Sequence, residues 1–142
     1  MSINTVGIIG AGTMGTGIAQ VCATTGIDVV LQDIGEAALE RSVATIRSQL
    51  DRQVSKGKLD EAARDAALGR IRTTSDPAGL ARTDLVIEAA TENEALKLEI
   101  LGKVEKLLAP ETIIATNTSS ISITRLAAGL SRPGKVVGMH FF

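Results

Sequence analysis

Residues 5–33 of this chain read TVGIIGAGTMGTGIAQVCATTGIDVVLQD, which predicts a strand, a glycine turn, a helix and a second strand. The first apolar run, Thr5–Ile9, shows no alternation of polar and apolar side chains, as is typical of a strand buried on both faces. A helical pattern, Met14–Thr25, leads from the turn to the second run, Asp28–Leu31. The turn consists of Gly10, Ala11, Gly12, Thr13, Met14 and Gly15. Its GxGxxG pattern is weak alone, and the strand and helix around it make it informative.

An acidic residue, Asp33, closes the second strand 23 residues after Gly10. This spacing predicts a Rossmann-type dinucleotide-binding unit, although a turn without a ligand is the alternative. Gly10 permits the tight turn, Gly12 lets the backbone approach a pyrophosphate, and Gly15 lets the helix pack against the strand. A carboxylate at Asp33 accepts hydrogen bonds from the adenosine ribose and repels a 2′-phosphate. We therefore expect residues 10–15 and Asp33 to bind NAD rather than NADP.

The rest of the chain alternates strand-like and helical runs. Helices are expected at Glu36–Ser55, from a cap at Asp60 to Leu68, briefly after Asp76-Pro77, at Glu94–Leu108 and at about Ile123–Leu130, with strands at Ile71–Thr74, Leu85–Ala89, Thr112–Thr116 and Lys135–Met139. The order predicts an α/β fold with a doubly wound, mainly parallel sheet and helices on both faces. We expect one domain over residues 1–142 and ligands beyond the carboxyl ends of the strands.

The composition narrows the classes of protein further. Hydrophobic residues make up 44% and charged residues 22% of the 142, which indicates a globular rather than a disordered chain. A net charge of −1 and only two aromatic residues argue against a nucleic-acid partner. The single cysteine, Cys22, permits no internal disulfide, and we expect it to be a buried apolar residue rather than a catalytic thiol. We find no signal peptide, membrane span or metal-ligand cluster, and expect a cytoplasmic protein.

Two segments after the later strands are more specific than the nucleotide-binding turn. Asn117-Thr118-Ser119-Ser120 follows one strand, and His140-Phe141-Phe142 follows another. Together with GAGTMG and residues 88–93 (EAATEN), these segments closely resemble the 3-hydroxyacyl-CoA dehydrogenases. The resemblance covers the whole chain and is closest to the short-chain bacterial 3-hydroxybutyryl-CoA dehydrogenases. It implies NAD-dependent oxidation of a (S)-3-hydroxyacyl-CoA to a 3-oxoacyl-CoA, and the reverse, in fatty acid or related acyl-CoA metabolism.

The resemblance assigns two residues to catalysis. His140 matches the histidine that acts as general base on the 3-hydroxyl while C3 passes a hydride to the nicotinamide. An imidazole suits both directions because its unperturbed pKa is about 6.5. Ser119 matches the serine that hydrogen-bonds the substrate oxygen near the nicotinamide. The alternatives are a structural histidine and a serine that serves only in the loop or as a cap.

The resemblance also assigns binding residues. Glu92 and Lys97 match positions that line the NAD site. Lys56 matches a lysine that contacts the CoA phosphate, and Gln49 matches a neighbouring CoA contact with a poorer fit of residue type. Lys56 also belongs to a basic group that could be a solvated helix face. Its members are Arg47, Arg52, Lys56 and Lys58. We assign no chemistry to Glu88, which fits a strand end with a structural partner.

The resembling enzymes continue beyond the segment that ends here at Phe142. Their next segment completes the sheet and supplies a glutamate that orients the histidine. A helical domain then contributes an asparagine, much of the acyl pocket and the dimer interface. The resemblance thus implies that the C-terminal helical domain is absent, that the NAD-binding domain is incomplete at its end, and that the full-length protein is a homodimer. We expect the fragment to bind NAD, turn over little substrate and self-associate through its exposed edge.

Two other functions are weighed against this one. A dehydrogenase of the 3-hydroxyisobutyrate or 6-phosphogluconate type shares the nucleotide unit and a methionine in the turn, but the NTSS and HFF segments argue against it. A non-catalytic NAD-binding protein is the second alternative, and the retained His140 and Ser119 argue against it. The length and substituents of the acyl chain stay open, as does the physiological direction.

Overall fold

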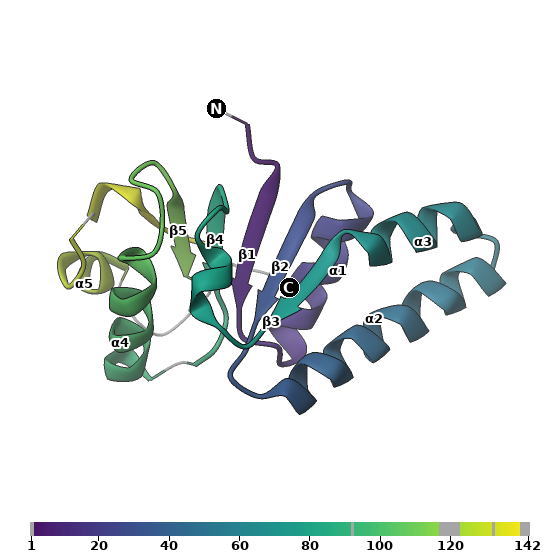
Figure 1. Ribbon diagram of the computed structural model, residues 1–142, viewed down its shortest axis with the longest axis horizontal. Coiled ribbons are helices and arrows are strands. Elements are labelled where there is room, and N and C mark those ends of the chain that lie inside the picture. Colours follow the sequence, from purple (N-terminus) through teal and green to yellow (C-terminus); the bar gives the residue numbers. More distant parts are fainter. Residues whose placement is uncertain (1, 92, 117–122, 132, 140–142) are drawn as a thin grey trace.

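The computed structural model describes residues 2–91, 93–116, 123–131 and 133–139. These residues form one sheet with the strand order β3-β2-β1-β4-β5-β6, in which each neighbouring pair is parallel. The strands are β1 (Thr5–Ile9), β2 (Asp28–Gln32), β3 (Ile71–Thr74), β4 (Leu85–Glu88), β5 (Ile113–Thr116) and β6 (Val136–Gly138). All carboxyl ends therefore lie along one edge of the sheet, the lower edge in Figure 1. The predicted doubly wound parallel sheet is confirmed.

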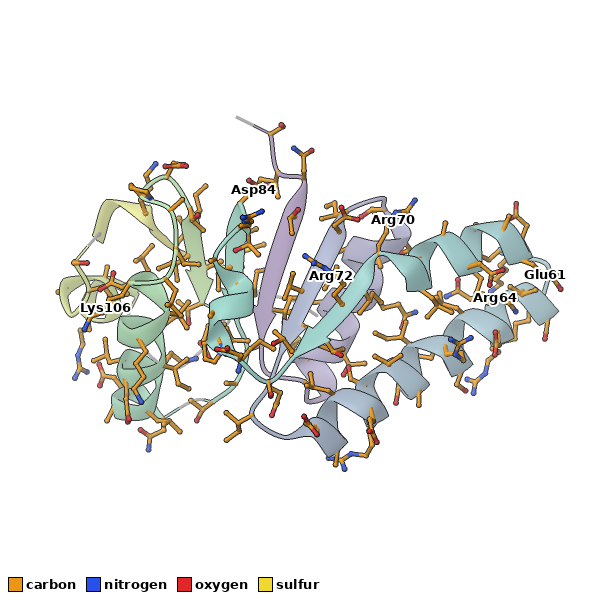
Figure 2. All side chains as sticks on the ribbon, in the orientation of Figure 1. Glu61, Arg64, Arg70, Arg72, Asp84 and Lys106 are labelled. Carbon is orange, nitrogen blue, oxygen red and sulfur yellow. The ribbon has the colours of Figure 1, made fainter. Side chains whose placement is uncertain are left out.

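Helices cover both faces of this sheet. They are α1 (Thr13–Thr24), α2 (Glu36–Ser55), α3 (Glu61–Gly69), α4 (Glu94–Glu105) and α5 (Ile123–Ala128), with short 3₁₀ turns η1 (Pro77–Leu80) and η2 (Pro133–Lys135). In Figure 1, α1, α2 and α3 lie to the right of the strands, and α4 and α5 to the left. Helices α2 and α3 run side by side beyond the sheet, where Figure 2 labels Arg64. Arg64 Nη1 lies 3.0 Å from Asp51 Oδ1.

Successive strand residues enter two separate cores, which explains the unbroken apolar runs in the sequence. Ile8 and Leu31 pack in the core beneath α1 and α2. Their neighbours Ile9 and Val30 pack with Leu101 of α4 on the opposite face. Because side chains alternate across a strand, a sheet covered on both faces needs apolar residues at every position.

The predicted N-caps are confirmed, whereas several predicted helix bounds shift by one to three residues, most of all the end of α4. The carboxylate of Asp60 accepts a hydrogen bond from Ala63 N at 2.7 Å, and that of Asp76 accepts one from Ala78 N at 2.9 Å, as expected of N-caps. Helix α4 ends at Glu105, three residues before the predicted end at Leu108. After Glu105 the backbone hydrogen bonds join residues three apart, as in a 3₁₀ turn, for example from Leu108 N to the carbonyl of Glu105 at 3.4 Å.

The opposite edge of the sheet carries an aspartate that organises the start of β1. The carboxylate of Asp84 accepts hydrogen bonds from the backbone N–H groups of Asn4 and Thr5, at 2.8 and 3.0 Å. These bonds lower the pKa of Asp84 below its ordinary value. Figure 2 shows Asp84 at the amino end of β4, away from the glycine turn. Within the ranges described above, no helix has the length and apolar character needed to cross a membrane.

Candidate functional site

The glycine turn after β1 lies against the segment that follows β4. Gly10 has φ +106°, a conformation that favours glycine, and its N–H donates to the carbonyl of Gln32 at 2.8 Å. A Cβ at Gly10 would lie 2.9 Å from both the carbonyl oxygen of Ala89 and the Cα of Ala90. The predicted tight turn is confirmed, and the contact with residues 89–90 adds a second reason for glycine at this position.

The start of α1 is open to an anion. Gly12 is the N-cap residue, and in the described structure no side chain caps this helix end and no acidic residue lies in its first turn. The first backbone N–H groups of a helix have no partner within the helix, and the helix dipole favours negative charge there. A Cβ at Gly12 would meet no atom within 4 Å. The space in front of the turn therefore has room for a pyrophosphate, whose binding here stays a prediction.

Glycine is needed at position 15 for a closer contact than the predicted one with the strand. A Cβ there would lie far inside van der Waals contact with the carbonyl oxygen of Gly10 and 2.9 Å from its carbonyl carbon. The strand contact that the sequence predicts is looser, with Ile8 Cγ2 at 3.5 Å. Gly15 thus allows the first turn of α1 to close on the glycine turn itself, and its packing against the strand comes second.

Asp33 joins the glycine turn to the loop before α2. Its Oδ2 accepts a hydrogen bond from Ala11 N and its Oδ1 accepts one from Gly35 N, both at 2.8 Å. A carboxylate can accept about four hydrogen bonds, so capacity remains for the hydroxyls of a ribose. The two backbone contacts fix the orientation of this carboxylate.

Two hollows meet at the glycine turn. The first has a volume of about 700 Å³ and lies between the turn, α1 and α2. The second has a volume of about 430 Å³ and lies between the end of β2 and α4, where Ile34 contributes a side chain that is 89% exposed. Both hollows are lined by Gly10, Asp33 and Ala90. An extended ligand with a phosphate at the turn and groups on either side fits this arrangement.

The predicted CoA residues lie along α2. Gln49 and Lys56 line one hollow of about 260 Å³ together with Arg52, Gln53 and Lys58. Gln49 also lines the hollow at the glycine turn, so the two hollows adjoin along the helix. Arg47 lines a separate hollow beside β3. The basic group seen in the sequence is therefore divided, and three of its four members remain together.

A buried ion pair was not predicted from the sequence. Glu88, the last residue of β4, and Lys97 of α4 are both 0% exposed, and Lys97 Nζ pairs with Glu88 Oε1. Thr116 Oγ1 donates to the same oxygen at 2.9 Å. Lys97 is expected to line the NAD site, but it is not among the lining residues of either hollow at the glycine turn. The sequence does contain a sign that Lys97 is buried. Lys97 precedes Leu101 by four residues and Val104 by seven, and this spacing places the lysine on the apolar face of the helix.

Three predicted residues, Glu92, Ser119 and His140, lie outside the described residues. The chain that precedes two of them is described. Thr116 ends β5, three residues before Ser119, and Met139 N donates to the carbonyl of Thr116 at 3.1 Å. The segments that contain Ser119 and His140 thus follow from neighbouring points at the carboxyl edge of the sheet.

The thiol of Cys22 packs against the core and lies away from the glycine turn in the sequence. Cys22 is half-buried against the core beneath α1, and burial raises the pKa of its thiol above the ordinary value. A raised pKa leaves less thiolate at neutral pH, which fits the expected packing role.

Among the side chains that the structure places, no three His, Cys, Asp or Glu residues are close enough to hold a metal ion.

Comparison with known proteins identifies the family. A sequence profile described as the 3-hydroxyacyl-CoA dehydrogenase NAD binding domain matches residues 5–142. The chain is 50% identical to a 3-hydroxybutyryl-CoA dehydrogenase of Bradyrhizobium diazoefficiens, a match that covers 98% of this chain and 47% of that protein. It is 42% identical to a 3-hydroxyadipyl-CoA dehydrogenase of Escherichia coli K12, over 100% of this chain and 30% of that protein.

Solved structures agree with these sequence matches. The crystal structure of (S)-3-hydroxybutyryl-CoA dehydrogenase from Ralstonia eutropha superposes with a TM-score of 0.97 at 55% identity, covering 99% of this chain and 50% of that one. The chain thus spans half or less of the length of these relatives. The glycine turn, Asp33 and the profile match over residues 5–142 show that this chain belongs to the 3-hydroxyacyl-CoA dehydrogenase family and corresponds to its NAD-binding domain.

Proposed function

We propose that these residues form the cofactor-binding part of an enzyme that oxidises a short-chain (S)-3-hydroxyacyl-CoA to a 3-oxoacyl-CoA, and catalyses the reverse reaction. The observation that carries the proposal is the open glycine turn at the carboxyl edge, with Asp33 held beside it and a hollow on each side. The names of the relatives support the acyl-CoA substrate. We place the reaction in fatty acid or related acyl-CoA metabolism in the cytoplasm, in a homodimeric enzyme.

The backbone of the turn and Asp33 would hold the cofactor. The N–H groups at the start of α1 bind the pyrophosphate of NAD, and the carboxylate of Asp33 accepts hydrogen bonds from the hydroxyls of the adenosine ribose. NAD supplies a hydride acceptor when it is bound. Glu92 and Ser119 are proposed to line this site, with Ser119 near the nicotinamide, whereas the fully buried Lys97 pairs with Glu88 behind the wall of the site.

Replacing Asp33 with alanine should weaken NADH binding by about 1.5–3 kcal/mol, since charge-assisted hydrogen bonds to the ribose are lost. The backbone N–H groups of Ala11 and Gly35 also lose their acceptor, which loosens the turn. The dissociation constant of NADH is measured by calorimetry. Asp28→Ala, at the exposed start of the same strand, is the matched control and should bind NADH normally. Equal affinities for Asp33→Ala and the parent would rule out the ribose role.

The basic hollow on α2 is the proposed site of the CoA phosphates. Lys56 and Gln49 share it with two further cations, and it adjoins the hollow at the glycine turn. An acyl-CoA bound here would lie along α2, with its thioester end toward the carboxyl edge of the sheet. The arrangement favours a multiply phosphorylated substrate over a small free acid.

His140 is proposed as the general base that takes the proton from the 3-hydroxyl. We expect His140→Ala to lower the reaction rate about a hundredfold, the lower end of the usual contribution of such a base. The NADH dissociation constant should stay at the parent value, because the imidazole acts on the substrate. Steady-state kinetics and NADH titration of the same preparation measure both. A variant that keeps its rate would remove His140 from the mechanism.

The test of the function is a substrate panel. NADH oxidation is followed with acetoacetyl-CoA, longer 3-oxoacyl-CoA thioesters, a dicarboxylic thioester and small free 3-oxo acids. The complete polypeptide that contains these 142 residues is used, because the relatives are about twice as long or longer. We expect turnover of the thioesters only. Turnover of the free acids instead would assign the chain to another dehydrogenase class. The 142 residues alone are expected to bind NADH with little turnover.

A further inference from the structure

A buried carboxylate, Glu88, lies beside the glycine turn and has no part in the chemistry proposed above. It is 0% exposed and ends β4. Its Oε1 accepts from Lys97 Nζ of α4 and from Thr116 Oγ1 at the end of β5. One side chain thus ties together two strand ends and the helix between them.

The other oxygen of Glu88 holds the backbone of the segment that follows β4. Oε2 accepts a hydrogen bond from Ala90 N at 2.7 Å and one from Thr91 N at 3.3 Å. Four donors therefore meet one carboxylate, and each of its oxygens receives two. A glutamine could not replace Glu88. Its amide NH₂ group donates hydrogen bonds, so it would face two of these donors without offering them an acceptor.

This segment forms a wall of the cofactor site. Ala90 lines both hollows, Ala89 lines the first and Thr91 lines the second. The same segment is packed against Gly10, where a Cβ would lie 2.9 Å from it. A change in the backbone of residues 89–91 would therefore change the space on both sides of the glycine turn.

The buried Glu88–Lys97 pair indicates that Glu88 positions the neighbouring backbone and does more than stabilise the fold. A buried ion pair contributes little net stability compared with well-packed apolar residues. At Glu88 the pair and its hydrogen bonds join two strand ends, a helix and the segment after β4. Here the groups that are joined converge at the carboxyl edge, where ligands bind in parallel sheets. Lys97 balances the charge of a carboxylate that has no access to water.

We propose that Glu88 is a positioning residue of the cofactor site, which acts through the backbone of residues 89–91 and depends on Lys97 and Thr116 for its own orientation. Glu88 itself touches no cofactor in this scheme. The proposal rests on the proposed NAD site, so the NADH affinity of the parent protein is measured first.

Two threonines provide the test: Thr116, the last residue of β5, and Thr112, which directly precedes the strand. Thr116→Val removes one donor to Glu88, whereas Thr112→Val removes a buried hydroxyl bond of 3.0 Å to the carbonyl of Thr83, at the far edge of the sheet. Both side chains are buried, so their losses of thermal stability should be similar. We expect Thr116→Val to weaken NADH binding roughly three- to tenfold, the equivalent of one hydrogen bond, and Thr112→Val to bind like the parent.

Two further variants separate positioning from folding. Thr116→Ser keeps the hydroxyl and should restore the affinity. The charge-free double variant Glu88→Leu/Lys97→Met removes the acceptor of the Ala90 and Thr91 N–H groups, and should bind NADH at least tenfold more weakly even where it folds. NADH is titrated by fluorescence in the complete polypeptide, with melting temperatures measured alongside.

Each outcome decides between the two proposals. A parent that binds no NADH overturns the proposed function together with this inference. A parent that binds NADH, with equal affinities for Thr116→Val and Thr112→Val, overturns the role of Glu88 alone. Restoration by Thr116→Ser, with loss in Thr116→Val only, supports it. If the double variant does not fold, the threonine comparison still decides.

Discussion

Gly15→Ala should abolish NADH binding and lower the free energy of unfolding by about 3 kcal/mol, at the upper end of overpacking costs. The new methyl group would overlap the carbonyl oxygen of Gly10, a backbone atom that cannot rotate away. Relief requires α1 to move from the sheet or the glycine turn to open. Either movement displaces the N–H groups that face the pyrophosphate.

Gly12→Ala should weaken NADH binding without changing the stability of the fold. Gly12 has φ −78° and ψ −164°, which alanine adopts without strain, and its Cβ would meet no protein atom within 4 Å. The fold should keep its stability, while the methyl group occupies space that the pyrophosphate needs. We expect normal unfolding and a loss of NADH affinity of at least tenfold.

Chemical denaturation and NADH titration of both variants test these two predictions. Gly17→Ala in the same helix is the control for stability only, because its Cβ also meets no atom within 4 Å but Gly17 lines the hollow at the glycine turn. It should raise stability by about 0.5–1 kcal/mol, as expected for glycine to alanine within a helix. A Gly15→Ala protein as stable as the parent would contradict the steric account. Normal NADH affinity in Gly12→Ala would place the pyrophosphate elsewhere.

Local rules explain why much of the fold could be predicted from the sequence. The turn needs a glycine with positive φ at Gly10, and caps such as Asp60 and Asp76 act within three residues of their own position. The strands Thr5–Ile9 and Ile71–Thr74 were predicted with the observed bounds. Such features depend on short segments, so a single sequence contains the information they need.

Long-range contacts explain what could not be predicted. Glu88 meets Thr116 28 residues later, and Asp33 meets Ala11 22 residues earlier. The sequence indicated a carboxylate at each position, but it did not indicate the backbone N–H groups that each one holds. The contact of Gly15 with Gly10 likewise depends on how the helix closes on the turn. The roles of Glu92, Ser119 and His140 remain predictions.

Removing the cation from the buried ion pair should be the most destabilising single change on α4. Lys97→Met leaves the carboxylate of Glu88 without its charge partner, in a place that water does not reach. Breaking a buried pair in this way costs about 3–5 kcal/mol. Lys103→Met is the matched control on the same helix. Its partner Glu99 lies four residues before it, 3.4 Å away, with both side chains exposed, and such pairs contribute about 0.5 kcal/mol or less.

The double variant Glu88→Leu/Lys97→Met distinguishes charge burial from loss of packing. If the cost of Lys97→Met comes from an unpaired charge, replacing both partners with apolar side chains should restore most of the stability, because no charge stays buried. Urea unfolding of the parent, the single variants and the double variant, without cofactor, gives the coupling free energy. A double variant no more stable than Lys97→Met would show that shape, rather than charge balance, governs this part of the core. Restored stability together with weak NADH binding would separate folding from positioning at Glu88.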